Sequence, residues 1–369
     1  MRSISRRDQS GPRRRRFAAG GSFVAGAASL VLASLVLASP VTSQAAVHVL
    51  KGIRTTATAV KTAGPGATTT LLEPGPTGPS TVPDPTDSSG GRDRIAQPDL
   101  PGLGPSLGVP VPAGWSSTVQ LAQTGALLRD YVVVQPVKSV PGPLPVLVVL
   151  DGLHMTPAGV ARVTGFLSIV GRAVVVFPAG YGRSWDAGGC CGLARAAGVD
   201  DVSFLTTVVH DVLATVPGTS AQDVYLTGFS NGGRMAYHMA CVDPGLFAGV
   251  AAVEAVPVPA CDPSHPVSIA IVAFQNDPLL SISMPQPTNM VYGMVELRVD
   301  EVVAQWRQID GCVGNPTVRQ DGTATVSLWT TCQNQTRVQY VLYAGGAHRW
   351  PQGDPGTPSA SQLIWSFLR

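Results

Sequence analysis

One serine of this chain lies in a sequence that can make its hydroxyl a nucleophile. Ser230 is at the centre of the GxSxG string GFSNG at 228–232. An apolar run at 224–227 predicts a strand before it, and the periodic segment 231–241 predicts a helix after it, which is the context of a nucleophile elbow. The flanking Gly228 and Gly232 permit the tight turn that such a strained serine needs. A GxSxG string alone is weak in a chain with 41 glycines, but with this context it predicts Ser230 as a nucleophile.

A serine hydroxyl needs a histidine as base, and in hydrolases with this elbow the chain order is serine, acid, histidine. Only His265 and His348 follow the elbow helix. His348 lies in a glycine-rich turn after a predicted strand, whereas His265 stands near two prolines before a strand, so we predict His348 as the base. His154 lies close to the predicted oxyanion loop and is a candidate substrate contact.

The predicted acid is Asp277, which follows the apolar run 267–274 and precedes His348 in the chain. An aspartate before a proline is also common in ordinary turns, and Asp300 and Glu301 at a helix start are alternatives. Backbone N–H groups of Leu153, after the strand at 146–150, and of Asn231, at the helix start, are the predicted oxyanion donors.

Valine-rich runs alternate with helical patterns from about residue 115 to the C-terminus. Near-continuous apolar runs of this length are typical of strands that are covered on both faces. The predicted strands are 131–134, 146–150, 173–177, 224–227, 267–274 and 338–343, and the predicted helices are 202–213, 231–241, 300–309 and 359–368. This order predicts an α/β fold with a doubly wound, mostly parallel sheet and helices on both faces, whose site lies beyond the carboxyl ends of the strands.

The first 45 residues have the pattern of an export signal: seven arginines, an uncharged apolar run at 17–39, and small residues before Ala46. The apolar run is also long enough for an uncleaved membrane anchor. Residues 46–114, rich in Pro, Thr, Gly and Ser, predict a disordered linker, and 115–369 predict one catalytic domain. We therefore expect a secreted protein or one of the cell envelope, with contact to a membrane only through that anchor.

The charge balance argues against nucleic acid as a partner. The chain has 25 basic and 23 acidic residues, but residues 1–45 hold seven of the basic and one of the acidic ones, which leaves a net charge of −4 on the remainder. A folded part that binds nucleic acid would present a basic face.

Six cysteines, all after position 189, predict disulfides in an exported protein: Cys190, Cys191, Cys241, Cys261, Cys312 and Cys332. Their spacing does not match a metal site. Cys312 and Cys332 flank a predicted strand region and are the preferred pair. Cys190 and Cys191 are then expected to pair separately with Cys241 and Cys261, in either arrangement.

Several segments besides the elbow carry a family resemblance. They are 182–192 (GRSWDAGGCCG), 199–202 with Phe204, 227–241 (TGFSNGGRMAYHMAC), 276–278 and 345–351 (GGAHRWP). From about residue 128 the chain thus resembles the polyhydroxybutyrate depolymerase-like esterases, which are related to secreted feruloyl and acetylxylan esterases of the α/β-hydrolase superfamily. The resemblance implies hydrolysis of a carboxylic ester through an acyl-enzyme, with Ser230, Asp277 and His348 at the triad positions and without metal or organic cofactor.

The chain departs from the family pattern at Asp151-Gly152, where the family has His-Gly, and at 274–276, where it tends to have His-Gly-Thr. The Asp151 carboxylate either disfavours an oxyanion nearby or points away and caps the loop. Trp185 and Trp350 either line the substrate pocket or cover the core. The rival functions are an acyltransferase acting on envelope glycolipids, a non-catalytic envelope protein that retains the fold, and a serine peptidase, which the cysteine-bearing motifs disfavour.

Overall fold

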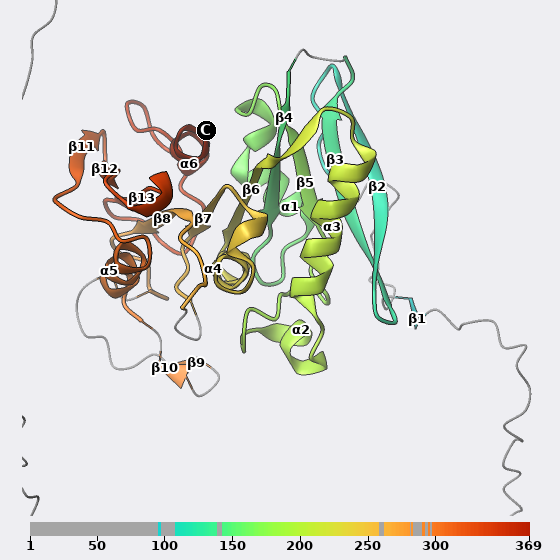
Figure 1. Ribbon diagram of the computed structural model, residues 1–369, viewed down its shortest axis with the longest axis horizontal. Coiled ribbons are helices and arrows are strands. Elements are labelled where there is room, and N and C mark those ends of the chain that lie inside the picture. Colours follow the sequence, from blue (N-terminus) through green and yellow to red (C-terminus); the bar gives the residue numbers. More distant parts are fainter. Residues whose placement is uncertain are drawn as a thin grey trace, which may run out of the picture. The chain divides into compact units, whose positions relative to one another are not determined.

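The computed structural model describes residues 95–96, 108–138, 142–257, 262–280, 282, 290–291, 294–295 and 297–369 (Figure 1). The predicted export signal, Cys261 and most of the predicted linker lie outside these residues. Within the linker range, strand β1 (Ile95–Ala96) pairs in parallel with Leu127 and Leu128.

The described residues form one eleven-stranded sheet in the order β1-β3-β5-β4-β6-β7-β8-β13-β12-β11, with β2 paired to β3. The strands, in chain order after β1, are β2 (Trp115–Thr124), β3 (Leu127–Pro136), β4 (Leu144–Leu150), β5 (Val174–Pro178), β6 (Thr219–Phe229), β7 (Gly249–Val253), β8 (Ser268–Phe274), β11 (Thr317–Asp321), β12 (Ala324–Trp329) and β13 (Val338–Tyr343). The central strands from β5 to β13 are parallel, and antiparallel strands flank them. A separate antiparallel pair joins β9 (Met290–Val291) to β10 (Met294–Val295).

Both faces of the sheet are buried, which explains why the strands are near-continuous apolar runs. In β4, Val146, Val148 and Leu150 belong to one core cluster, whereas Leu147 and Val149 belong to the other. Helices α3 (Asp201–Thr215), α4 (Asn231–Val242) and α5 (Val299–Ile309) pack into the first cluster, and α1 (Pro157–Thr164) and α6 (Ala360–Leu368) into the second (Figure 1). The predicted α/β class, with a mostly parallel sheet between two layers of helices, is confirmed.

Local capping fixes where these helices begin. Asp200 precedes α3 and its carboxylate accepts a hydrogen bond from the Ser203 N–H at 2.8 Å, which caps the helix. Ser359 caps α6 with a reciprocal bond to Gln362. The short helix α2 (Gly192–Ala197) lies between β5 and α3. In the described part of the chain, no helix is long and apolar enough to cross a membrane.

The cysteines confirm one expected pair and correct another. Cys312 and Cys332 form a disulfide, as predicted. Cys190 and Cys191 are joined to each other across a cis peptide bond, so the expectation that each pairs separately with Cys241 and Cys261 is wrong. In an extended trans chain, the side chains of neighbouring residues point to opposite sides, so a bond between adjacent cysteines is not evident from their spacing. Cys241 is also disulfide-bonded.

Candidate active site

The turn between β6 and α4 has the geometry of a nucleophile elbow. Ser230 has φ 54° and ψ −116°, a strained conformation for a residue with a side chain. Its N–H donates to the Val253 carbonyl at 2.9 Å, which ties the turn to β7. A Cβ at Gly228 would meet the Gly232 carbonyl, and one at Gly232 would meet the backbone of Leu150 and Asp151. The two glycines are therefore required by the close approach of three backbone segments, and they expose the serine hydroxyl.

Three side chains from three different strand ends meet at this elbow. The His348 Nε2 lies 2.7 Å from the Ser230 Oγ, and the His348 Nδ1 lies 2.7 Å from the Asp277 Oδ2. His348 follows β13 and Asp277 follows β8, which is the neighbour of β13 in the sheet. The structure thus places together the three residues that the sequence singles out. The arrangement can remove the proton from the serine as its oxygen attacks a carbonyl carbon.

Asp277 is 5% exposed and remains a strong acid in spite of its burial. Burial alone would raise its pKa, but hydrogen bonds from His348, Glu254 and the Leu279 N–H outweigh burial and lower the pKa to about 2. The Leu279 N–H donates to Oδ1 at 2.6 Å, which leaves Oδ2 for the histidine. Asp277 is therefore ionised at neutral pH and can stabilise an imidazolium on His348.

The two predicted oxyanion donors, the N–H groups of Leu153 and Asn231, lie on different segments. Asn231 is the first residue of α4, where an N–H has no acceptor within the helix. The Leu153 N–H makes no hydrogen bond with another described residue, whereas its neighbour His154 donates to the Arg183 carbonyl at 2.8 Å. The Leu153 loop touches α4 through the contact between Gly232 and Asp151. Both predicted oxyanion donors therefore belong to segments that adjoin the Ser230 turn.

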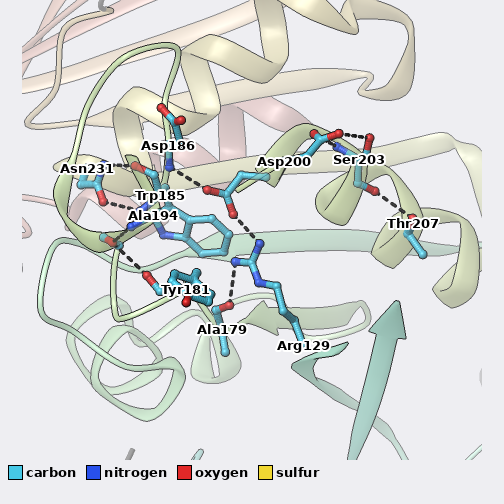
Figure 2. A network of polar contacts seen from close by, with 12 residues as sticks. Arg129, Ala179, Tyr181, Trp185, Asp186, Ala194, Asp200, Ser203, Thr207 and Asn231 are labelled. Atoms are coloured by element: carbon cyan, nitrogen blue, oxygen red, sulfur yellow. Dashed lines mark hydrogen bonds and ion pairs between the residues drawn. The ribbon is translucent and has the colours of Figure 1, made fainter. Parts of the chain in front are cut away.

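A buried polar network holds these two segments together, and Figure 2 shows its contacts between Trp185 and Asn231. The Asn231 amide accepts from the Trp185 N–H at 2.8 Å and donates to the Trp185 carbonyl at 2.9 Å. The Trp185 indole N–H donates to the Asp151 Oδ1 at 2.9 Å and to the Asp151 carbonyl at 3.0 Å. One tryptophan therefore links the start of α4 to the loop after β4.

The Asp151 carboxyl is 1% exposed and points into the core toward Trp185, not toward the candidate oxyanion site. Burial raises its pKa to about 7, although the Trp185 hydrogen bond and the nearby Arg129 charge act in the opposite direction. The carboxyl is therefore neutral over the acid range. The concern that it faces a developing oxyanion does not apply to this orientation.

The other predicted contacts divide between the core and the surface. Trp185 is 0% exposed and stacks on Phe204, and Trp350 is 3% exposed with its N–H on the Ser361 hydroxyl at 2.9 Å. Both indoles are buried in the core and donate their N–H groups there, which agrees with the alternative that they cover the core and not with the alternative that they line a substrate pocket. His154 is exposed, with a positive φ of 65°.

The alternatives to the predicted triad residues have other roles. His265 is exposed and its Nδ1 lies 2.9 Å from the neighbouring Ser264 hydroxyl. Asp300 and Glu301 pair with Arg298 at the start of α5. Sequence reasoning missed Glu254, a buried residue directly after β7, because only the order of the strands brings it beside Asp277.

Among the described residues, the group that could hold a metal ion is Glu254, Asp277 and His348, whose ligand atoms lie within 4.8 Å of one another. Both ring nitrogens of His348 already contact Asp277 and Ser230. A metal bound through either nitrogen would replace one of these contacts, so the donor set fits a proton relay better than a metal centre.

The mostly parallel sheet, the elbow after β6 and the acid and histidine after β8 and β13 define an α/β-hydrolase. A family model described as "Putative esterase" matches residues 129–349, which is more than half of the chain, and the chain belongs to this esterase family.

Individual relatives agree with this family. The chain is 26% identical over 200 residues to "Probable feruloyl esterase C" of Aspergillus terreus, a match covering 54% of this chain and 65% of the relative. It is 30% identical over 174 residues to "Putative esterase NocK" of Nocardia uniformis, covering 42% and 49%. The chain therefore spans between about half and two thirds of the curated relatives that it matches. Among solved structures, the acetyl xylan esterase from Aspergillus awamori is 13% identical with a TM-score of 0.48, covering 68% of this chain and 98% of that one.

Proposed function

We propose that this chain is an exported serine esterase that hydrolyses carboxylic esters through an acyl-enzyme on Ser230. The observation that carries the proposal is the unbroken series of contacts from Asp277 through His348 to Ser230, with 2.7 Å at each step. The series begins at a buried carboxylate and ends at a strained serine on a tight turn. Such a constellation has the activated nucleophile and the oriented base that acyl transfer needs.

The reaction divides into two steps with the same proton path. The His348 Nε2 accepts the Ser230 proton while Oγ forms a bond to the ester carbonyl carbon, and the oxyanion is held by the N–H groups of Leu153 and Asn231. Collapse of the tetrahedral intermediate breaks the ester C–O bond, and His348 returns its proton to the departing alcohol. Water then attacks the acyl-enzyme in the same way, which releases the acid and restores Ser230.

The names of the relatives, rather than a pocket, support the proposed substrate class. The curated relative of Aspergillus terreus carries the name of a feruloyl esterase, and the solved structure is of an acetyl xylan esterase. We propose esters of the feruloyl, acetyl or polyhydroxyalkanoate kind, met outside the cytoplasm. The predicted export signal and the disulfides support that location.

The test is hydrolysis of p-nitrophenyl acetate, p-nitrophenyl butyrate and methyl ferulate by the purified full chain. Ser230→Ala removes the nucleophile and is expected to lower kcat by at least about 10³-fold, because removing a triad member leaves only the oxyanion contribution. Ser264→Ala, at an exposed serine away from the elbow, is the matched control and should keep full activity. Equal rates for the wild type and Ser230→Ala, in folded protein, would contradict the proposal.

A further inference from the structure

Glu254 is a buried carboxyl that the reaction described above does not use. It follows the last residue of β7 and is 1% exposed, with a positive φ of 49°. Its N–H donates to the Val272 carbonyl of β8 at 2.9 Å, which fixes the backbone against the neighbouring strand. Since β8 ends at Phe274, this position brings the Glu254 side chain to Asp277.

The two oxygens of this carboxyl have different surroundings. Oε1 accepts a hydrogen bond from the Phe274 N–H at 2.7 Å. Oε2 is buried and receives no hydrogen bond from a donor among the described residues. The polar group beside it is the Asp277 carboxyl, whose oxygen lies within 4.8 Å of the Glu254 oxygen. A hydrogen bond between the two acids would require a proton on one of them, because two carboxylates offer only acceptors.

The surroundings decide which acid keeps the proton. Asp277 receives hydrogen bonds from the Leu279 N–H and from His348, whereas Glu254 receives one from the Phe274 N–H. Burial, followed by the hydrogen bond and the charge of Asp277, raises the pKa of Glu254 to about 11, while the pKa of Asp277 stays at about 2. The other titratable groups facing this pair are His348 and the buried Tyr340 hydroxyl of β13.

We propose that Glu254 is a positioning residue of the esterase site: a neutral acid whose Oε2–H donates to Asp277 and fixes that carboxylate toward the His348 Nδ1. The proposal rests on the proposed function, since it assigns a role within the same triad. Glu254 itself touches neither the serine nor the ester. It acts by holding Asp277 in one orientation and by adding no second negative charge beside it.

The experiment compares two substitutions at Glu254 on p-nitrophenyl acetate. Glu254→Gln keeps the size, the acceptor for the Phe274 N–H and a donor toward Asp277, so kcat is expected to stay within about 3-fold of the wild type. Glu254→Met has a similar volume but no donor, and kcat is expected to fall by about 10- to 100-fold with KM within about 2-fold, the loss of one hydrogen bond to a charged group. Full activity in Glu254→Met, with its unfolding transition unchanged, would overturn the proposal.

A pH profile of kcat/KM separates this role from an ionised glutamate. If Glu254 is neutral, Glu254→Gln changes no charge, and the acid limb that reports His348 should coincide with that of the wild type. If Glu254 were ionised, the same substitution would remove a negative charge near the imidazole and move that limb to lower pH by about one unit. Such a shift would reject the proposal.

Infrared difference spectra detect the proton on Glu254 without a measurement of turnover. The C=O stretch of a protonated carboxylic acid should be present in the wild type at pH 8 and absent from Glu254→Gln. A protein that shows this band but hydrolyses none of the three esters would refute the proposed esterase while leaving the proton on Glu254. A protein that hydrolyses them without the band would refute the neutral acid alone.

Discussion

At the scale of single residues, Asp151 shows how the contribution of a buried carboxyl to folding stability depends on its protonation state. Its Oδ1 accepts the Trp185 indole N–H, and its Oδ2 has no partner among the described residues. Burial raises its pKa to about 7, well above its ordinary value of 3.8. Between these values the folded protein binds a proton that the unfolded chain releases, so folding is favoured by acid at this residue.

Because protonation of Asp151 is coupled to folding, the effect of Asp151→Asn on the free energy of unfolding should depend on pH. The stability contributed by the raised pKa is fully present below pH 3.8 and is lost as the pH rises through about 7. Asparagine keeps an acceptor for Trp185 and never ionises. The free energy of unfolding of the variant, relative to the wild type, should therefore increase by about 1–3 kcal/mol from pH 5 to pH 8. Urea unfolding at four pH values measures this, and a difference that stays constant with pH would contradict it.

At the scale of elements, a buried ion pair joins β3 to the start of α3 (Figure 2). The Arg129 guanidinium lies 2.5 Å from the Asp201 Oδ1 and donates to the Ala179 carbonyl at 3.0 Å. The other Asp201 oxygen accepts from the Asp186 N–H at 2.6 Å, next to Trp185. A salt bridge in this position fixes the 182–192 segment, which hydrogen-bonds to Asp151 and His154 of the loop after β4.

Removing one partner of that ion pair should lower the free energy of unfolding more than removing both charges. Arg129→Met is expected to lower the free energy of unfolding by about 3–5 kcal/mol, because it leaves the Asp201 carboxylate buried and unpaired. The double variant Arg129→Met, Asp201→Asn keeps an acceptor for the Asp186 N–H. Its free energy of unfolding should therefore fall less than that of the single Arg129 variant. Urea unfolding of the wild type, both single variants and the double variant completes the cycle. Additive effects would show that the pair is not coupled.

The sequence predicts most of the central elements but not those whose pattern is weak. The strands that end at Leu150, Phe274 and Tyr343 are long apolar runs, and all three were found. Strand β2 was missed because it is an edge strand with polar residues on its exposed side, and β7 because its five small residues resemble many buried segments. Glu254 was missed for another reason: its place beside Asp277 depends on the order of the strands, which no residue spacing encodes.

At the scale of the whole molecule, apolar packing on both faces of one sheet and disulfide bonds stabilise the fold. The two core clusters take alternate residues of the same strands, so the layers of helices are stabilised together. The Cys312–Cys332 disulfide closes a loop around β11 and β12 at the sheet edge, where antiparallel strands leave the central core. It therefore strengthens one edge of the sheet, outside the central parallel strands.

The predicted consequence is a loss of stability when that loop is opened. The two cysteines are 20 residues apart, and closing such a loop lowers the entropy of the unfolded chain by an amount worth about 3 kcal/mol. The double variant Cys312→Ser, Cys332→Ser should therefore unfold at lower urea with a free energy reduced by about 3 kcal/mol, while p-nitrophenyl acetate hydrolysis at 25 °C stays near the wild-type rate. The control is the wild type treated with a reductant, which should approach the variant. A variant as stable as the oxidised wild type would mean that the bond adds nothing to this edge, and would weaken the argument that the chain is built for an oxidising compartment.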